Sequence, residues 1–187
     1  MSDLPHQLNL GCGRRRRPDC LNVDLRAEVE PDMAFDLNCR PYPLPRGHFQ
    51  HIFAHDVVEH LAHVKDFVEE AHELLAPGGI LEITTPHFSS GNSYADPTHL
   101  HHLSYFSFDY FTDGSSWNFY SAARFEIADR QLVFYNAPLD RLAARLANRN
   151  PELYEKRFAW LFPAWFLIFK LRAVKAPAPS ACCESAT

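Results

Sequence analysis

Four short apolar runs lie in the first third of the chain, and polar or glycine residues end each of them. Gly11 and Gly13 follow the first run, while Asp24 and Asp36 lie near the ends of the next two. Apolar runs of this length, bounded by turn residues, predict β-strands. The expected strands are residues 8–10, 21–25, 33–37 and 51–54.

An amphipathic helix is expected after the fourth strand. Phe67, Ala71 and Leu74 recur at helical spacing among charged residues, and Pro77-Gly78-Gly79 is typical of a helix end. A fifth strand over 80–85 follows directly. A strand–helix–strand unit over 51–85 indicates parallel strands. The sequence therefore predicts an α/β fold with a Rossmann-like, mostly parallel sheet and helices on both faces.

The second half begins with a long aromatic and His-rich connection, residues 86–120, which we expect to act as a lid or substrate loop. Packing of its aromatic side chains in the core is an equal alternative. A strand over 123–135, a helix from 139 to 146 that extends toward Phe158, and a final strand over 165–174 complete a single domain, 1–175. The composition of residues 176–187, rich in Ala, Pro and Ser, predicts a disordered tail. The apolar stretch 158–169 favours a helix end and a buried strand over a membrane-docking face.

Composition and charge narrow the function classes. The chain has 187 residues, a net charge of -5 and five cysteines without a CxxC pair. Its length suits one domain, and its acidity argues against nucleic acid as a partner. We expect reduced thiols in the cytoplasm, because we identify no signal peptide. No apolar run reaches the roughly 20 residues of a transmembrane helix.

Five motifs occur in an informative order: LNLGCG, NVD, FDL, HDVVEHL and LLAPGGILEI. Together they resemble the class I S-adenosylmethionine-dependent methyltransferases, specifically a small bacterial branch, over roughly residues 7–110. The resemblance implies S-adenosyl-L-methionine as cofactor and an antiparallel final strand. It also implies a set of cofactor-binding residues at the ends of the first four strands. These are Leu10, Gly11, Cys12, Gly13, Asp24, Leu25, Asp36, Leu37, His55 and Asp56.

Two departures from the family pattern concern the first crossover. Asn9 stands where the family often has an acidic residue, and Arg15 stands where it has a third glycine. Only ten residues separate Gly13 from Asp24, too few for a helix of about 11 residues and the next strand. We therefore expect this helix to be shortened or absent. The cofactor site is then open or covered by a second subunit of a homodimer. The run Arg14–Arg17 in this gap is a solvated loop or an anion clamp.

The resemblance implies methyl transfer to an oxygen or nitrogen of a small-molecule or saccharide-like acceptor by in-line displacement. Such a reaction depends mainly on positioning and desolvation, and a base assists when the acceptor is a hydroxyl or a protonated amine. Histidine suits this task near neutral pH. We take His60, His87 and His99 as candidate catalytic residues, although His60 could equally pack against its helix.

Other functions remain open at this point. His87, Asp96, His99 and His102 are chemically suited to zinc or iron, although their spacing is unspecific and we assign no metal ligand. The same fold could also support a non-methylating or metal-dependent reaction, or a cofactor-binding subunit of a partner enzyme. A membrane-peripheral module that uses residues 158–169 is a weaker alternative.

Overall fold

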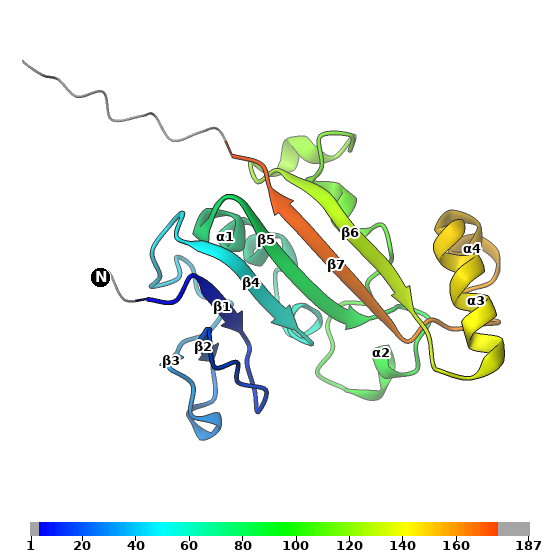
Figure 1. The fold of residues 1–187 in the computed structure, drawn as a ribbon, viewed down its shortest axis with the longest axis horizontal. Helices are drawn as coiled ribbons and strands as arrows, with labels where there is room; N and C mark the ends of the chain where they lie inside the picture. Colours follow the sequence, from blue (N-terminus) through cyan, green and yellow to red (C-terminus); the bar gives the residue numbers. More distant parts are fainter. Residues whose placement is uncertain (1–3, 176–187) are drawn as a thin grey trace, which may run out of the picture.

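The computed structural model describes residues 4–175, which form a seven-stranded mixed sheet with helices (Figure 1). The strand order is β3-β2-β1-β4-β5-β7-β6; the first five strands are parallel, and β7 is antiparallel to both neighbours. This confirms the predicted fold class. The predicted tail 176–187 lies outside the described residues. The strands are β1 (Gln7–Leu10), β2 (Leu21–Asp24), β3 (Met33–Ala34), β4 (Phe49–His55), β5 (Leu75–Pro86), β6 (Phe125–Val133) and β7 (Phe166–Ala173).

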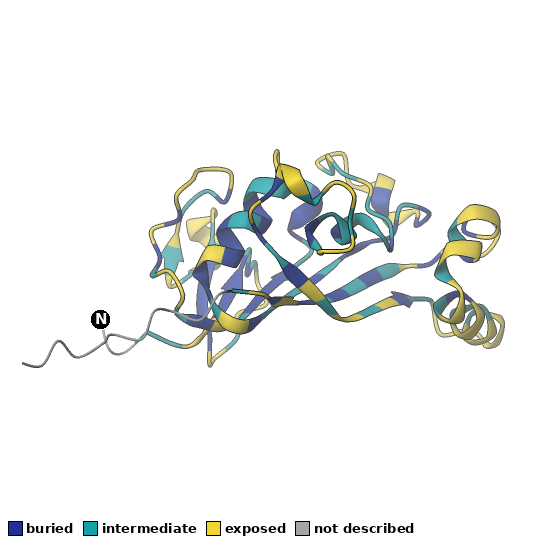
Figure 2. Ribbon diagram, turned by 90° about the horizontal axis from the view of Figure 1, so that it is seen from above, coloured by how far each residue is buried: buried dark blue, intermediate teal, exposed yellow. Residues whose placement is uncertain are grey.

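The helical cover, which we expected on both faces, is concentrated on one face of the sheet (Figure 2). The connections 11–20, 25–32 and 35–48 contain no α-helix, so the expected absence of the first crossover helix is confirmed. Among residues 4–175, no helix is long and apolar enough to cross a membrane. The helices are α1 (Val64–Leu74), α2 (Asn92–Ala95), α3 (Pro138–Arg149) and α4 (Pro151–Arg157), with 3-10 turns η1 (Ala27–Val29), η2 (Val58–His60), η3 (Ser107–Phe111) and η4 (Asn118–Tyr120).

The two faces of the sheet differ in polarity. Along β7, Leu167, Phe169 and Leu171 are buried on the helical side. Their neighbours Lys170 and Arg172 point to the other side and remain partly or fully exposed. Side chains alternate across a strand, so one face can pack while the other meets water. The hydrophobic core therefore lies between the sheet and the layer that contains α1.

The boundary between α1 and β5 differs from the expectation. The helix ends at Leu74, and the strand begins at Leu75 and continues through Pro77-Gly78-Gly79. The pairing with β4 shifts register here, which marks a bulge. A Cβ on Gly79 would lie 2.9 Å from the Phe49 carbonyl oxygen, so glycine allows the two strands to approach. The glycines thus lie in a bulged strand and do not cap the helix, which ends at Leu74. The third strand is shorter than predicted, since only Met33–Ala34 pairs.

The predicted helix over 139–158 is divided into α3 and α4 at Asn150. The Asn150 side chain accepts a hydrogen bond from the Leu153 N–H at 3.0 Å, and Pro151 occupies the first turn of α4. An N-cap followed by proline starts a new helix. The helix end and the buried strand expected within 158–169 are the end of α4 and the start of β7. Between them Phe158, Leu161 and Phe162 are exposed, whereas Ala159 is buried.

The connection 86–120 contributes to both the core and the surface. Tyr105, Phe108 and Phe111 are buried, whereas Trp117 and Phe119 are 60% and 66% exposed. Part of the aromatic series is therefore ordinary core packing. The role of the segment as a lid or substrate loop stays a prediction.

Candidate functional site

The turn after β1 brings the two glycines against the end of β2. Gly11 and Gly13 have φ angles of +65° and +49°, a conformation that glycine adopts without strain. The Gly13 N–H donates to the Asp24 carboxylate at 2.8 Å. A Cβ on Gly11 would lie 2.3 Å from a methyl carbon of Val57. Glycine is therefore required at position 11 both by the backbone and by packing.

Buried asparagines hold the helix-free first crossover. Asn9 donates from its side chain to the Arg15 carbonyl at 3.1 Å and to the Asn22 side-chain oxygen at 3.0 Å. That oxygen also accepts from the Arg17 N–H at 2.8 Å. The sequence marked Asn9 only as a departure from the family pattern. Its amide donates to a backbone carbonyl, which a carboxylate could not do.

Three arginines of the Arg14–Arg17 run bind other residues of the chain. Arg15 pairs with Asp56 at 3.0 Å and Arg16 with Asp32 at 2.5 Å. The Arg17 guanidinium lies 3.8 Å from the centre of the Phe53 ring. Residues 15–17, the glycine turn and His55 line a cavity of about 240 Å³.

Asp56 has a left-handed backbone conformation and one carboxylate oxygen without a hydrogen-bond donor. Its φ is +58°, and its N–H donates to the Thr84 carbonyl at 3.0 Å. One carboxylate oxygen, Oδ1, is buried and has no hydrogen-bond partner within residues 4–175. An unsatisfied buried oxygen is suited to bind an ammonium group or another donor. Together with the Asp24 carboxylate, it gives the ends of β2 and β4 the acceptors that ribose hydroxyls and an amino group require.

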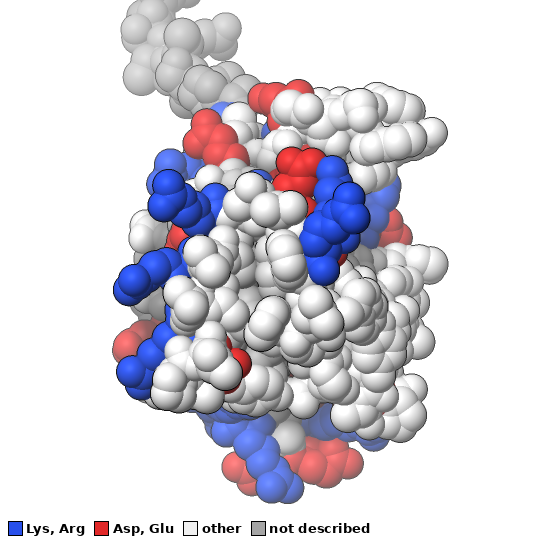
Figure 3. Space-filling model, turned by 90° about the vertical axis from the view of Figure 1, so that its right-hand side faces the viewer, with Lys and Arg blue, Asp and Glu red and all other residues white. Residues whose placement is uncertain are grey.

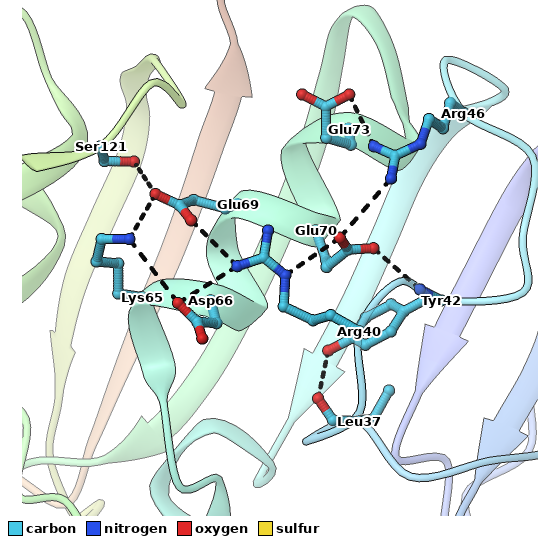
Figure 4. Close-up of polar contacts among 10 residues, drawn as sticks. All are labelled: Leu37, Arg40, Tyr42, Arg46, Lys65, Asp66, Glu69, Glu70, Glu73 and Ser121. Atoms are coloured by element: carbon cyan, nitrogen blue, oxygen red, sulfur yellow. Dashed lines mark hydrogen bonds and ion pairs between the residues drawn. The ribbon is translucent and has the colours of Figure 1, made fainter.

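The loop after β3 is fixed by the polar network drawn in Figure 4. The Tyr42 hydroxyl donates to the Leu37 carbonyl at 2.6 Å, and the Tyr42 N–H donates to Glu70 of α1 at 3.1 Å. Burial raises the pKa of Tyr42, so its hydroxyl stays a donor. Arg40 pairs with Glu70 at 3.2 Å. Leu37 is thereby held in a buried position beside the predicted cofactor-binding residue Asp36.

A second cavity, of about 540 Å³, lies at the ends of β4 and β5. We call it the acceptor cavity. Asp56, Glu59, His60, Asp96, His99 and Phe166 are among its lining residues. Since His55 lines the first cavity and Asp56 the second, consecutive residues of the chain connect the two.

Glu59 is a site residue that the sequence analysis did not identify. It is only 1% exposed, and neither carboxylate oxygen has a hydrogen-bond partner in the described chain. Burial raises the pKa of Glu59 to about 7. The one available signal was a carboxylate among the apolar residues of the HDVVEHL motif. Buried unpaired carboxylates of this kind are enriched at functional sites.

Histidines 60 and 99 lie together in this cavity, with ring centres 4.6 Å apart. His60 Nδ1 lies 2.9 Å from the Thr98 hydroxyl, and His99 Nδ1 lies 3.1 Å from the Ser93 carbonyl. The His60 ring is not on an α-helix as expected, because only a 3-10 turn, η2, spans Val58–His60.

His87 occupies a different environment. Its side chain is fully buried, with Nε2 3.0 Å from Glu155 and Nδ1 2.7 Å from the Ser89 hydroxyl. It does not line the acceptor cavity. His102 bonds to the Ser93 hydroxyl at 2.8 Å. The metal set considered from the sequence is therefore not assembled, and among the described residues only His99 of that set joins a cluster of metal-binding side chains.

Of the remaining predicted residues, Cys12 lines the first cavity. Leu10 and Cys12 are buried, and Cys12 donates its N–H to the Val23 carbonyl at 2.9 Å. Leu25 is 58% exposed. The carboxylate of Asp36 accepts from the Asn38 N–H at 2.8 Å.

Comparisons with known proteins agree on the fold. A family model described as "Methyltransferase domain" matches residues 8–126. A S-adenosylmethionine-dependent methyltransferase from Mesorhizobium loti has a TM-score of 0.55 at 18% identity, covering 89% of each chain. One from Archaeoglobus fulgidus has a TM-score of 0.57 at 16% identity, covering 91% of this chain and 86% of the other.

The cyclase SpnF also resembles this chain, with a TM-score of 0.56 at 16% identity, over 91% of this chain and 75% of the cyclase. At these identities the likeness concerns the fold alone. No curated protein matches the sequence.

Proposed function

The chain belongs to the methyltransferase-domain family, and on that premise we propose that it transfers a methyl group from S-adenosylmethionine to an oxygen or nitrogen of a small-molecule or saccharide-like acceptor. The observation that carries this proposal is a pair of cavities, of which His55 lines one and the next residue, Asp56, lines the other. One contains the glycine turn, and the other contains polar side chains able to meet an acceptor.

Side chains at the ends of β2 and β4 and after β3 fit the cofactor. The Asp24 carboxylate offers acceptors for ribose hydroxyls, and the buried unpartnered oxygen of Asp56 offers one for an ammonium group. Leu37 and Asp36 would meet the adenine. When bound, S-adenosylmethionine would supply a methyl group on a sulfonium: an acceptor lone pair attacks the methyl carbon in line, and the carbon–sulfur bond breaks to release S-adenosylhomocysteine. A carboxylate near that positive charge is electrostatically favourable.

The chain's own contribution is to orient the acceptor and to receive its proton. His60 and His99 line the acceptor cavity, and each ring has its Nδ1 engaged in a hydrogen bond. The remaining nitrogen, Nε2, is then free to accept a proton from an acceptor hydroxyl or ammonium. We therefore assign proton removal to His60 or His99. His87 is not part of this assignment because it does not line the cavity.

Binding of S-adenosylhomocysteine to the full chain, measured by calorimetry, tests the proposal. We expect one site per chain and an affinity at least about tenfold lower for Asp24→Ala, because a hydrogen bond to a charged group contributes about 1.5–3 kcal/mol. Asp19→Ala, an exposed carboxylate of the same crossover, is the control. Absence of binding, or equal binding by Asp24→Ala, would overturn the proposal.

The alternative is a non-methylating use of the same cofactor fold, or a cofactor-binding subunit of a partner enzyme. Mass spectrometry separates these possibilities: a methyltransferase adds the mass of one methylene unit to its acceptor and releases S-adenosylhomocysteine. We place the reaction in the cytoplasm, because Cys12, Cys20 and Cys39 are free thiols.

A further inference from the structure

Three potential metal ligands converge in the acceptor cavity. One carboxylate oxygen of Glu59 and one ring nitrogen each of His60 and His99 lie within 4.8 Å of one another. Glu59 and His60 come from η2, after β4, whereas His99 comes from the connection after β5. Two imidazoles and one carboxylate form a common ligand set for zinc and iron, and three protein ligands leave positions open for a substrate.

Glu59 lacks the partner that a buried carboxylate needs. Its side chain is 1% exposed, and both oxygens are without a hydrogen-bond donor in the described chain. Burial of a carboxylate without a partner is costly, and the group becomes protonated unless a cation compensates its charge. A cation at this point would satisfy the group.

The hydrogen bonds of the two histidines orient both rings for coordination. The Thr98 hydroxyl donates to Asp96 at 2.7 Å, so it accepts from His60 Nδ1–H at 2.9 Å. His99 Nδ1–H donates to the Ser93 carbonyl at 3.1 Å. Each ring therefore carries its proton on Nδ1 and has a lone pair on Nε2. Metal-binding histidines are usually fixed in this way by a hydrogen bond from the other nitrogen.

We propose that Glu59, His60 and His99 bind a divalent first-row transition-metal ion, with Zn²⁺ as the first candidate. Ligand distances of about 2.0–2.2 Å would bring the three atoms to about 3.3 Å from one another. The assignment rests on the proposed function in one respect, that the acceptor enters the same cavity. There the ion would lower the pKa of an acceptor hydroxyl, and with the ion bound both imidazoles would be ligands in place of the proton acceptors assigned above.

Metal binding by the chelator-treated full chain tests this site. Titration with Zn²⁺ by calorimetry and with Co²⁺ by visible absorption should each show one ion per chain. Glu59→Gln and His99→Ala should weaken binding at least about tenfold, the lower limit for loss even of a residue that supports a ligand. His102→Ala is the matched control, because this histidine of the same connection bonds to Ser93 but lies outside the cluster.

Two outcomes would overturn the metal site: no stoichiometric binding by the wild-type chain, or unchanged binding by both ligand variants. If a variant fails to fold, the intensity of the Co²⁺ absorption of the wild-type chain still reports whether protein ligands surround the ion. Binding of S-adenosylhomocysteine is measured on the same metal-free protein. Loss of metal binding alone rejects the inference, whereas loss of S-adenosylhomocysteine binding alone rejects the proposed function.

A second and independent observation concerns the apolar face of α3 and α4. Leu139, Leu142 and Leu146 recur at helical spacing on α3 and are 74%, 55% and 59% exposed. With Leu153 and Phe162 they line a cavity of about 530 Å³ that opens on the surface. Figure 3 shows this end of the molecule as a broad area of uncharged side chains, with both Lys or Arg and Asp or Glu at its margins. An apolar area of this kind on a helix pair marks an interaction surface.

The positive net charge of the segment that contains α3 and α4 favours an anionic partner. Residues 138–162 contain five Lys or Arg and three Asp or Glu, although the whole chain has a net charge of -5. One of the three, Glu155, points inward to His87 at 3.0 Å. Trp160 is 67% exposed at the end of this segment. Leucines beside arginines, with tryptophan at the margin, are typical of helices that lie on membranes with anionic lipids. In a dimer formed through this face, the cationic residues of one copy would lie against those of the other and repel them.

From this face we infer that α3 and α4 dock on an anionic lipid surface. The test is flotation of the full chain with vesicles of phosphatidylcholine, with and without phosphatidylglycerol. Binding should require the anionic lipid, decrease with salt and disappear in the double variant Leu142→Glu, Leu146→Glu. Leu25→Glu changes an equally exposed leucine near β2 and should bind normally. Failure to float, or flotation of the double variant, would overturn the inference. So would dimerisation that the double variant abolishes in the absence of lipid.

Discussion

The guanidinium of Arg15 donates to the carboxylate of Asp56 across 3.0 Å, which joins the loop after β1 to the end of β4. The Arg15 side chain is 80% exposed, and an exposed pair contributes only about 0–1 kcal/mol. The Arg15–Asp56 ion pair is thus weak enough for each residue to bind a ligand group in place of the other. A ligand that carries both a carboxylate and an ammonium group could engage both residues at once.

Replacement of either partner should therefore weaken ligands that carry an amino-acid portion. We expect Arg15→Ala and Asp56→Asn each to lower the affinity for S-adenosylhomocysteine about tenfold. Asparagine is chosen because the φ of Asp56 is +58°, which asparagine tolerates. Methylthioadenosine lacks the amino-acid portion and should bind both variants as it binds the wild type. Calorimetry measures both ligands, with Arg14→Ala as control, and an equal loss for both ligands would contradict the exchange.

Tyr42→Phe tests how the loop after β3 is held. The variant removes the 2.6 Å hydrogen bond to the Leu37 carbonyl and nothing else of the side chain's shape. We expect the free energy of unfolding to fall by about 1–2 kcal/mol, because a buried acceptor loses its donor. Affinity for S-adenosylhomocysteine should also fall, since Leu37 borders the proposed adenine site. Urea denaturation and calorimetry measure the two effects, and Tyr94→Phe, an exposed tyrosine, is the control. An unchanged free energy would contradict the role of this bond.

The positions of the strands along the chain were predictable because apolar runs and turn residues mark them locally, whereas the antiparallel direction of the final strand was implied by the family resemblance. Residues 51–54, for example, lie within β4, and 165–174 contain β7. The start of β5 was not predictable in this way. Pro77-Gly78-Gly79 is typical of a helix end, and only the approach of Gly79 to the neighbouring strand reveals the bulge.

The site was predictable only where a single motif contains it. The glycine turn and Asp24 lie together because β1 and β2 are adjacent parallel strands. The Glu59–His99 cluster joins residues 40 positions apart through the fold of the connection after β5. His87 instead contacts Glu155 of α4, 68 positions further along the chain, which no local motif indicates.

The two glycines of the first turn should differ in their tolerance of alanine. Both have positive φ, which costs alanine about 1–2 kcal/mol. Only Gly11→Ala adds a contact, 2.3 Å from a Val57 methyl, whereas a Cβ on Gly13 has nothing within 4 Å. Urea denaturation should therefore show a larger loss of stability for Gly11→Ala than for Gly13→Ala. Addition of Val57→Ala should reduce the penalty of alanine at position 11. Equal penalties for the two single variants would contradict this account.

Glu155 should stabilise the protein in a pH-dependent manner. Its carboxylate accepts from His87 at 3.0 Å, from the Tyr105 N–H at 2.6 Å and from the Ser104 hydroxyl at 3.0 Å. Burial alone would raise its pKa, but these hydrogen bonds hold the pKa below the ordinary value of glutamate. A depressed folded-state pKa stabilises above the unfolded-state value, about 4.3, and this stability is lost as the pH falls through the folded-state value.

Glu155→Gln should accordingly lower the free energy of unfolding at pH 7 by about 1–3 kcal/mol. The difference from the wild type should stay constant down to about pH 5 and decrease below about pH 4, where the carboxylate takes up a proton. Urea denaturation followed by tryptophan fluorescence across this range measures the difference. Glu152→Gln is the control on the same helix, because Glu152 is exposed and pairs only with Lys156 one turn away. If the difference in free energy of unfolding instead grows toward acid pH, burial affects the pKa of Glu155 more than the three hydrogen bonds do.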